Sequence, residues 1–570
     1  MSASDLTPAA DGGEIVIDET GSPGSFTGQM LSSSTVDVAP PLLDKPILRL
    51  VDADFKETCE AAEKILALSI YSQGGALVRI GIAHEVREDD TLTERGRSIG
   101  RDGIERNPAQ CFLLPVTREF IERELSGLAD IQKPMADGKW KRCSCPERIA
   151  NNILRHGNSP HFRPLAGIAR APFIRSDGSV CTEPGYDPRS QTLYVPNAEF
   201  PELPSHISED EARDALAVLL DPFSEFPFAT ESARSAFVAH ILTEAARVAL
   251  DRAPIFFYTA PTAGTGKSLL CEMPATIVHG VEPALRDFVE PEEMRKTLFA
   301  SLVAGDRSLV FDNAPGGHKI RSAPLAKFVT ERYAIERKLG ETRNLSAINL
   351  AVVSVTGNNI TPAGDLARRS VPIRLDADMP SADLKARTFR IENLRPHVQE
   401  HRVELLTAAL MVLRGGQQSG YKGPTPMPSF EQWSRAVRDP LLWLGMADPL
   451  ESQADEADDE SGNVEDAFRL LAKTFSDREF MAQDVSQLAS GMLDASGELS
   501  GALIKAGCME PHSSQKVGYW LRDQRDRFGA GHKLIKSEAK YKGSGTKWRL
   551  RPRAGLLPAV ENSDLIGGAS

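Results

Sequence analysis

The segment Ala260–Leu270 restricts the possible folds of this chain more than any other. It reads APTAGTGKSLL, follows the apolar run PIFFYT and precedes the helix-like run SLLCEMPATIV. A strand, a glycine-rich loop and a helix in this order predict a phosphate-binding loop, because the loop N–H groups and the helix N-terminus both attract an anion. Further buried strands alternate with helices around this motif, which predicts an α/β sheet.

The loop supplies the groups that bind a nucleoside triphosphate. Gly264 and Gly266 let backbone N–H groups turn toward phosphate oxygens, and Lys267 is expected to neutralise the β- and γ-phosphates. Ser268 is expected to ligate Mg²⁺. Pro261 stands where the usual pattern has its first glycine, and since proline cannot donate a hydrogen bond, that end of the loop is expected to be stiffer. The predicted ATP-binding residues are Thr262, Ala263, Gly264, Thr265, Gly266, Lys267, Ser268 and Leu269.

An apolar strand, SLVFDN at 308–313, is the next motif along the chain, and it ends in Asp312, 45 residues after Lys267. A carboxylate at the carboxyl end of such a strand can hold Mg²⁺ together with Ser268. Many ATPases follow this aspartate with a glutamate that polarises the attacking water. Here Asn313 follows, which can orient water but cannot accept a proton. Either Asp312 serves both needs, or another carboxylate comes from elsewhere, or turnover is slow.

Two more motifs carry groups that suit phosphoryl transfer. The strand LAVVSVTGNN at 350–359 includes Asn358, which is expected between the loop strand and the Asp312 strand and can hydrogen-bond the γ-phosphate or the attacking water. The segment GDLARRSVPIRL then places Arg368 and Arg369 before another strand. A guanidinium is permanently charged and suits the charge that develops on the transferred phosphoryl group.

In the order Lys, Asp, Asn, Arg, these motifs resemble the AAA+ core of superfamily-3 helicases. They resemble more closely the primase-helicase-like replication proteins of phages, prophages and integrative elements. The similarity is carried by APTAGTGKSLL, LVAGDRSLVFDN, ERKLGETRN, VTGNN and GDLARRSVPIRL, with FRPLAGIARAPFIRSDGS and GYD upstream, and it covers about 160–445. It implies that Lys267 and Ser268 are the Walker A pair. It also implies that Asp312 is the Walker B acid and Asn358 the sensor-1 residue.

The resemblance further implies a ring with a pore. Arg369 corresponds best to an arginine finger that acts on the ATP of the neighbouring subunit, and Arg368 is the alternative. Such a finger implies a homo-oligomer, by family analogy a hexamer. The segment ERKLGETRN, 336–344, falls where these motors carry a hairpin that reaches into the pore. Arg337 or Lys338 would there grip single-stranded DNA, and a solvated charged turn is the other interpretation.

Charge is distributed unevenly along a chain whose net charge is −13. The stretch 447–466 has nine acidic residues and no basic one, whereas 501–553 has 13 Lys and Arg against four Asp and Glu. Helical patterns near 465–474, 484–493 and 513–528 and then two strand-like runs predict a winged helix. Its third helix is expected to enter the major groove of duplex DNA while the wing meets phosphates. The predicted DNA contacts are Lys516, Arg522, Arg525, Lys540, Lys542 and Lys547.

The fold expected for the whole chain is an α/β P-loop AAA+ ATPase core with an α+β N-terminal domain and a C-terminal winged helix. The role of the N-terminal domain stays open between a ring collar, a DNA-binding module and a degenerate primase part. The expected segments are a disordered 1–45, the N-terminal domain 46–205, the ATPase domain 206–446, an acidic linker 447–463, the winged helix 464–555 and a disordered tail 556–570.

The expected function follows from these parts. We expect an ATP- and Mg²⁺-dependent, ring-forming DNA helicase that replicates a phage, plasmid or integrative element, with a primase as a further partner that the resemblance leaves open. Seven thinly spread cysteines and the lack of a secretory signal or a long apolar run indicate a cytoplasmic protein without a membrane segment. The alternatives are an ATP-switched origin-binding or helicase-loader protein with little unwinding, and a regulatory or defence AAA+ ATPase.

Overall fold

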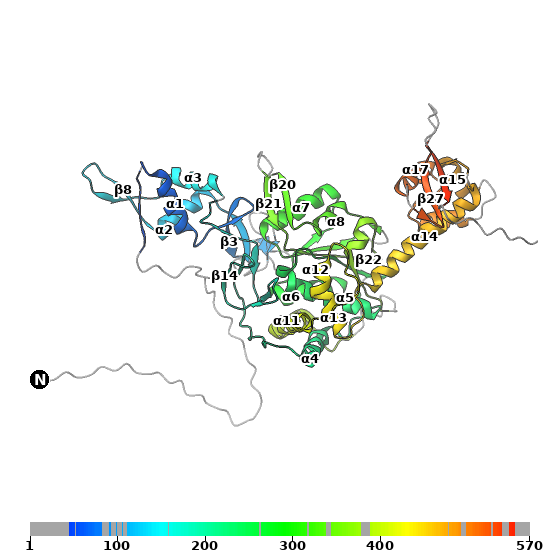
Figure 1. The fold of residues 1–570 in the computed structure, drawn as a ribbon, viewed down its shortest axis with the longest axis horizontal. Helices are drawn as coiled ribbons and strands as arrows, with labels where there is room; N and C mark the ends of the chain where they lie inside the picture. The colour runs from blue at the N-terminus through cyan, green and yellow to red at the C-terminus, as the bar shows by residue number, and fades with distance from the viewer. Residues whose placement is uncertain are drawn as a thin grey trace, which may run out of the picture.

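The computed structural model has a central α/β unit, an N-terminal α+β part and a small C-terminal unit (Figure 1). The N-terminal part is drawn in blue, and the C-terminal unit follows the long helix α14. The structure describes residues 45–51, 53–82, 91–92, 98–99, 105–106, 111–157, 159–261, 264–315, 319–337, 344–377, 388–476, 478–491, 497–525, 528–537 and 546–552.

Five parallel strands form the central sheet, in the order β17-β18-β22-β16-β24. β16 is buried along its whole length, as expected for a parallel sheet with helices on both faces. β22 lies between β16 and β18, where the sequence predicted the strand that carries Asn358. The predicted P-loop-type α/β core is therefore confirmed. The strands are β16 (Ile255–Ala260), β17 (Leu285–Asp287), β18 (Ser308–Ala314), β22 (Val352–Asn358) and β24 (Ser370–Arg374).

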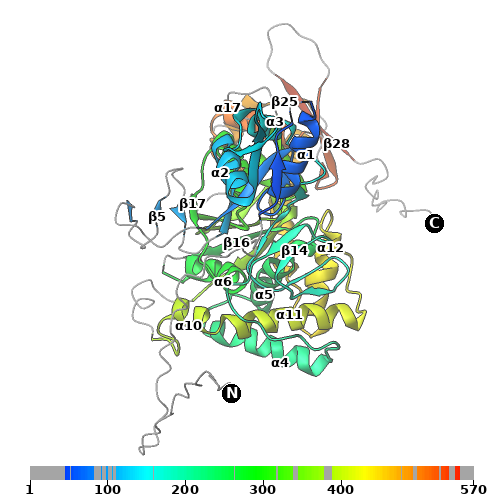
Figure 2. The same ribbon diagram turned by 90° about the vertical axis from the view of Figure 1, so that its left-hand side faces the viewer.

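Helices cover this sheet. The predicted helix at 209–220 is α4, and the one predicted at 231–250 is α5 (Glu231–Ala246), which continues as a 3₁₀ turn to Ala249. α5 and α6 pack against strands, α11 packs on both helices and α4 packs on α11 (Figure 2). None of the helices in the described ranges combines the length and hydropathy needed to cross a bilayer. The further helices are α4 (Glu209–Leu220), α6 (Lys267–His279), α7 (Pro291–Ala304), α8 (Ala323–Phe328), α10 (Leu394–Glu400), α11 (Arg402–Ser419), α12 (Glu431–Trp433) and α13 (Asp439–Trp443).

In the described residues the N-terminal part has three small sheets, ordered β1-β8-β9, β10-β2-β3-β7 and β4-β5-β6, and three helices with a common apolar core. The strand predicted at 76–82 is confirmed as β3. The helix predicted over 55–71 ends at Leu66, because the chain enters β2 at Tyr71. The elements are β1 (Ile47–Arg49), α1 (Phe55–Leu66), β2 (Tyr71–Gln73), β3 (Ala76–Ile82), β4 (Thr91–Leu92), β5 (Ser98–Ile99), β6 (Glu105–Arg106), β7 (Cys111–Pro115), α2 (Arg118–Leu128), β8 (Asp130–Pro134), β9 (Trp140–Arg142), α3 (Glu147–His156) and β10 (Arg163–Pro164).

Five short strands connect this part to the central unit. Their side chains Phe173, Cys181 and Tyr194 form a small apolar cluster against Val248, which follows α5. The segment therefore contacts the central unit through this cluster, while Leu165, Leu193 and Val195 pack with Tyr71 and Val78 of the N-terminal part. The strands are β11 (Gly167–Ala169), β12 (Phe173–Ile174), β13 (Val180–Cys181), β14 (Gly185–Asp187) and β15 (Thr192–Tyr194).

A two-stranded antiparallel hairpin, β20–β21, extends from the central unit at the segment ERKLGETRN. Tyr333 pairs with Ile348 and Arg337 with Asn344, which agrees with the expected hairpin. Its turn, 338–343, lies outside the described residues. The strands here are β19 (Lys319–Ile320), β20 (Tyr333–Arg337), β21 (Asn344–Ile348) and β23 (Thr361–Pro362).

The C-terminal unit differs from its prediction in two ways. Helix α14 begins at Glu451, so most of the expected acidic linker is helical. A helix that the sequence reading missed, α16, lies between the two helices expected near 484–493 and 513–528. A four-stranded antiparallel sheet, β25-β28-β27-β26, completes the unit. The elements are α14 (Glu451–Phe475), β25 (Phe480–Met481), α15 (Ala482–Ala489), α16 (Glu498–Lys505), α17 (Ser514–Asp523), β26 (Phe528–Gly529), β27 (His532–Lys536) and β28 (Lys547–Pro552).

Candidate nucleotide site

The glycine-rich loop lies at the carboxyl edge of the central sheet, between β16 and α6. Gly264 and Gly266 have φ of +89° and +85°, a conformation that glycine adopts without strain. A Cβ on Gly266 would approach the Phe226 ring to 3.0 Å, whereas one on Gly264 would meet no atom within 4 Å. The loop is therefore closed by protein at Gly266 and open to a ligand at Gly264. Two other predicted loop residues, Thr262 and Ala263, lie outside the described residues.

A chain of hydrogen bonds joins the ends of two strands, β18 and β22, to the start of α6 at this edge. The Lys267 ammonium donates to Asn358 Oδ1 at 2.8 Å, and the Ser268 hydroxyl donates to Asp312 Oδ1 at 2.7 Å. Thr356 Oγ1 donates to the same Asp312 oxygen at 2.5 Å. The structure thus brings together four predicted site residues, because β18, β22 and β16 are neighbours with parallel directions.

Thr356 is a site residue that sequence reasoning missed. The signal for it was present, because alternate residues of a strand point to the same face and Thr356 lies two positions before Asn358. Its side chain is almost completely buried, and besides donating to Asp312 it accepts the N–H of Asn313 at 3.1 Å. Thr356 therefore fixes both the carboxylate and the residue that follows it.

The end of β18 is irregular where it carries Asp312. The register with β22 shifts between Phe311 and Ala314, and Asn313 has a φ of +56°. Such a bulge redirects side chains, and here Asp312 faces Ser268 while Asn313 is exposed at the edge of the site. An exposed amide can hold a water molecule but offers no proton acceptor.

The donor set fits a magnesium-bound triphosphate. Only 9% of Lys267 is exposed, and this burial lowers the pKa of its ammonium while the charge of Asp312 opposes the shift. A poorly solvated cation gains much from a phosphate partner. The hydroxyl of Ser268 and the carboxylate of Asp312 are oxygen ligands of the kind that Mg²⁺ prefers. Thr265 is buried beside Lys267, and Leu269 packs against the core behind the loop.

The two candidate finger arginines differ sharply in their surroundings. The Arg369 side chain is only 14% exposed, and it donates to the Ala326 carbonyl and to Thr330 Oγ1 and pairs with Asp365 at 3.0 Å. The Arg368 side chain is 62% exposed and pairs only at the surface, with Asp365 at 2.5 Å. Arg369, which the resemblance favours as the finger, therefore holds α8 of its own chain, and Arg368, the alternative, is the more exposed of the two.

Neither arginine can reach the loop of its own subunit. In the parallel pairing of β24 with β16, Ser370 lies opposite Ile255 and Arg374 opposite Thr259. Arg368 and Arg369 therefore precede β24 at the amino edge of the sheet, about 17 Å from the carboxyl edge at roughly 3.3 Å per residue. Arg374 is a further cation that the sequence reading missed. It ends β24 at the nucleotide edge and lies 3.8 Å from Asp376.

The predicted DNA contacts lie in two regions. Lys516 and Arg522 on α17 and Arg525 just after it are exposed. Val517, Trp520 and Leu521 are buried as predicted, and Ser513 caps the helix. Lys547 on β28 pairs with Glu479 at 3.4 Å. Arg337 ends β20, but its side chain lies outside the described residues, as do Lys338, Lys540 and Lys542 entirely.

Tyr519 completes the exposed face of α17, and the sequence reading missed it. Gln515 Nε2 donates to its hydroxyl at 3.2 Å, and the Arg522 guanidinium lies 4.6 Å from its ring centre. These three side chains follow the helical spacing of one exposed stripe. They form a preassembled polar and aromatic surface.

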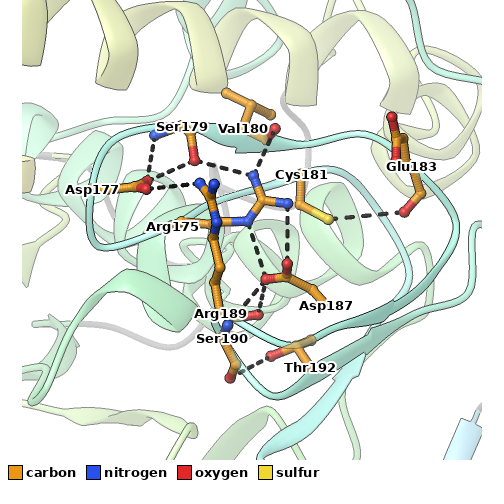
Figure 3. Close-up of polar contacts among 10 residues, drawn as sticks. All are labelled: Arg175, Asp177, Ser179, Val180, Cys181, Glu183, Asp187, Arg189, Ser190 and Thr192. Carbon is orange, nitrogen blue, oxygen red and sulfur yellow. Dashed lines mark hydrogen bonds and ion pairs between the residues drawn. The ribbon is translucent and has the colours of Figure 1, made fainter.

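The upstream motifs FIRSDGS and GYD meet in one polar network (Figure 3). Arg175 donates to both carboxylate oxygens of Asp187, at 3.1 and 3.2 Å, and Ser190 donates its N–H and its hydroxyl to the same carboxylate. Burial raises the pKa of Asp187, but the hydrogen bonds from Arg175 and Ser190 outweigh burial and the net pKa is lowered. In the described part of the chain, the hydrogen bonds of Arg175 and Asp187 stay within the segment 173–192, which indicates a structural role.

Searches with the whole chain found distant similarities only. The C-terminal region of NrS-1 shares 10% identity at a TM-score of 0.29, over 72% of this chain and 93% of its own. JCV helicase shares 14% identity at a TM-score of 0.20, over 42% of this chain and 68% of its own. Cch of SCCmec type IV, described as an active helicase, shares 10% identity at a TM-score of 0.29, over 85% of this chain and 97% of its own. Likenesses at this level establish neither family nor activity. No family model and no curated protein match the chain.

Proposed function

We propose that this chain is an ATP-driven, ring-forming DNA helicase of the AAA+ superfamily-3 type that serves the replication of a phage, plasmid or integrative element. One observation carries the proposal. Lys267, Ser268, Asp312 and Asn358 converge through hydrogen bonds of 2.7 and 2.8 Å at the carboxyl edge of a parallel sheet. This is the arrangement that a motor needs in order to bind and cleave a triphosphate.

The site residues have distinct roles when ATP binds. Lys267 exchanges the Asn358 amide for the β- and γ-phosphates, which releases Asn358 to hold the attacking water. Ser268 and Asp312 would hold Mg²⁺, which would supply positive charge against the phosphates. Asn313 cannot accept a proton, so Asp312, held by Thr356, is the carboxylate available to the water in this part of the described structure.

The arginine finger is Arg368 rather than Arg369. Arg368 is exposed and lies at the sheet edge opposite its own loop, so it can approach only the ATP of a neighbouring subunit. A site completed by a second subunit requires an assembly, and a closed ring is the form in which every site is complete. We propose a hexamer by family analogy.

Two surfaces engage the DNA. The β20–β21 hairpin contacts a single strand in the pore, with Arg337 or Lys338 near its turn. The C-terminal unit acts as a winged helix, with Lys516 and Arg522 of α17 and the following Arg525 on duplex DNA and Lys547 on the wing. Lys540 and Lys542 extend the same basic surface in sequence. Because these contacts neutralise phosphates, binding is expected to weaken steeply as salt rises.

The test is to measure ATP hydrolysis and forked-duplex unwinding side by side, with and without single-stranded DNA. We expect DNA-stimulated hydrolysis and unwinding, and we expect Lys267→Ala to abolish both while the circular dichroism spectrum is unchanged. Hydrolysis that survives Lys267→Ala would refute the site assignment.

One observation favours a second candidate, an ATP-switched origin-binding or loader protein. Asn313 stands where a catalytic glutamate is usual, so turnover can be slow enough for ATP to act as a switch. The same measurements separate the two candidates, because a loader binds DNA in an ATP-dependent manner without unwinding. A complete lack of DNA stimulation would instead indicate a regulatory ATPase.

A further inference from the structure

A tight turn of the N-terminal part contacts the β20–β21 hairpin. We propose that this turn, Gly74–Gly75 between β2 and β3, positions the hairpin and links it to the strand that carries Asp312. The inference rests on the proposed role of the hairpin as a DNA contact. It assigns the N-terminal part a role as a mechanical connection within the motor.

The contact is unusually close. Gly74 and Gly75 have φ of +56° and +83°, as in the two-residue hairpin turns that favour glycine. A Cβ on Gly74 would lie 1.6 Å from the Ser346 carbonyl oxygen and 2.6 Å from Ser346 Oγ. The backbone of the turn therefore sits directly on β21, and glycine is the residue that fits there.

The contact lies midway along β21, so it couples movement of this strand to the N-terminal part. β20 and β21 form a two-stranded sheet, so β21 has one edge that β20 does not pair. Ser346 lies in the middle of β21, opposite Ile335. The glycine turn covers β21 at this position, where an unpaired strand edge would otherwise be exposed. Any displacement of β21 toward the N-terminal part must move the turn or break the contact.

The same N-terminal sheet contacts the central unit at a second point. β3 pairs with β7 along its length, and Leu113 of β7 packs against Gly305, where a Cβ would come within 3.1 Å of Leu113 Cγ. Gly305 ends α7 and leads into β18, whose far end carries Asp312. Nearby, the Arg307 guanidinium donates to the Ile168 carbonyl at 3.4 Å.

One paired sheet thus spans two moving parts of the proposed motor. Its β7 edge contacts the end of α7 at Gly305, shortly before β18, and its β2 strand and β2–β3 turn contact β21 of the hairpin, which extends near the N-terminal part in the ribbon view (Figure 1). Hydrogen-bonded strands resist shear, so a shift at the start of β18 is passed to β21. The N-terminal part thus connects the ATP site to the DNA site mechanically.

Glycine substitutions test this inference with a matched control. Gly74→Ala adds a methyl group that collides with Ser346, and it also strains a backbone with positive φ. Gly138→Ala, in the turn between β8 and β9, imposes similar backbone strain at φ +79° but has no atom within 4 Å of the new Cβ. Gly138→Ala therefore controls for a methyl group added to a glycine of positive φ elsewhere in the N-terminal part, and the Ser346→Leu variant below tests the contact without strain in the β2–β3 turn.

The experiment measures amide hydrogen exchange in β21 of the full chain, together with ATPase activity with and without single-stranded DNA. We expect Gly74→Ala to speed exchange of β21 amides by roughly tenfold and to reduce the stimulation by DNA, with basal hydrolysis retained. Gly138→Ala should match the wild type in both. Equal β21 exchange in the two variants would overturn the inference.

A second variant covers the case in which Gly74→Ala unfolds the N-terminal sheet. Ser346→Leu enlarges the same contact from the hairpin side and leaves the glycine turn unchanged, so it should speed β21 exchange in the same way. Unchanged exchange in this variant also overturns the inference. Because exchange is read without DNA, the contact is judged separately from the proposed function, which fails if the wild type shows no response to DNA.

Discussion

Thr356 shows how one hydroxyl can organise a nucleotide site. It donates to Asp312 and accepts from the N–H of Asn313, so the carboxylate and the bulge share one buried partner. A hydrogen bond to a charged group contributes about 1.5–3 kcal/mol when its partner is buried. The aspartate is therefore held in place before any metal binds.

We predict that Thr356→Val lowers the rate of ATP hydrolysis roughly tenfold and raises the Mg²⁺ concentration needed for half-maximal activity. Valine keeps the volume of threonine but leaves Asp312 with one donor fewer. The control is Thr276→Val on α6, which is equally buried and bonds only to the Glu272 carbonyl of its own helix. A magnesium titration of activity that is identical in both variants would show that Thr356 does not position the carboxylate.

His240 provides a residue-scale test of the core behind the loop strand. It is 2% exposed, stacks on Phe256 with ring centres 4.2 Å apart, and shares a 2.7 Å hydrogen bond with the Tyr258 hydroxyl. Desolvation lowers the pKa of His240 to about 4, and the charge of Glu244 opposes this only in part. The ring is therefore neutral in the folded protein at neutral pH.

The unfolded chain protonates this histidine below about pH 6.5, whereas the folded protein does so only near pH 4. We therefore predict that folding stability falls as the pH drops from about 6.5 to about 4, with roughly 3 kcal/mol attributable to His240. Thermal unfolding measured across this range should show a weaker pH dependence for His240→Gln. Parallel curves for the two proteins would assign the acid sensitivity to other groups.

The sequence predicted the placement of Lys267, Ser268, Asp312 and Asn358, because the carboxyl ends of neighbouring parallel strands must meet at one edge. It did not predict the surroundings of Arg369. Two partners of that guanidinium, the Ala326 carbonyl and the Thr330 hydroxyl, lie about forty residues earlier, on and after α8. Only side-chain packing decides which of the two adjacent arginines is buried there.

At the scale of elements, the five short strands between β11 and β15 depend on polar contacts. Their apolar cluster is small, and Arg175 and Asp187 join β12 to β14 through two hydrogen bonds (Figure 3). Removing one partner of a buried pair leaves the other charge without compensation. This ion pair should therefore govern the local stability of the segment.

We predict that Asp187→Asn lowers the local stability of β11–β15 by roughly 3 kcal/mol, seen as faster amide exchange confined to these strands. The control is Arg189→Gln, which removes the exposed pair with Asp177 in the same unit and should cost about 0.5 kcal/mol or less. Equal effects of the two substitutions would mean that burial of the Asp187–Arg175 pair adds nothing to the local stability of β11–β15.

Helix α14 shows where composition misled the sequence reading. Nine acidic residues without an apolar stripe were interpreted as a linker, yet the helix starts at Glu451 and spans 25 residues. Acidic side chains near a helix N-terminus are favoured by the helix dipole, and the buried residues Val464, Phe468 and Leu471 anchor its far end in the C-terminal core. The helical span is about 37 Å long at 1.5 Å per residue.

At the scale of the whole molecule, the opposite placement of the loop and Arg368 can be tested by mixing subunits. We predict that Arg368→Ala and Lys267→Ala proteins are each inactive alone and regain part of the hydrolysis when combined. Mixed rings contain some interfaces with an intact loop on one subunit and an intact arginine on the other. Mixtures of Lys267→Ala with Arg369→Ala separate the two arginines, because Arg369→Ala should mainly destabilise α8. Failure of every mixture to recover activity would argue against a shared site.

The contacts between the N-terminal part and the central unit could not have been read from the sequence. Gly74 and Ser346 belong to segments far apart in the chain, and neither lies in a recognisable motif. Periodicity reports which face of an element is buried, but it does not report which distant element covers it. The role of the N-terminal part, left open by the sequence, depended on this packing.

The separation of Arg368 from the loop of its own subunit also has a kinetic consequence. In the proposed ring, Arg368 acts on the ATP of a neighbouring subunit, so we expect a solitary protomer to lack a complete site. Specific activity should therefore climb with protein concentration. At low concentration, newly made chains would therefore hydrolyse little ATP until enough copies have assembled.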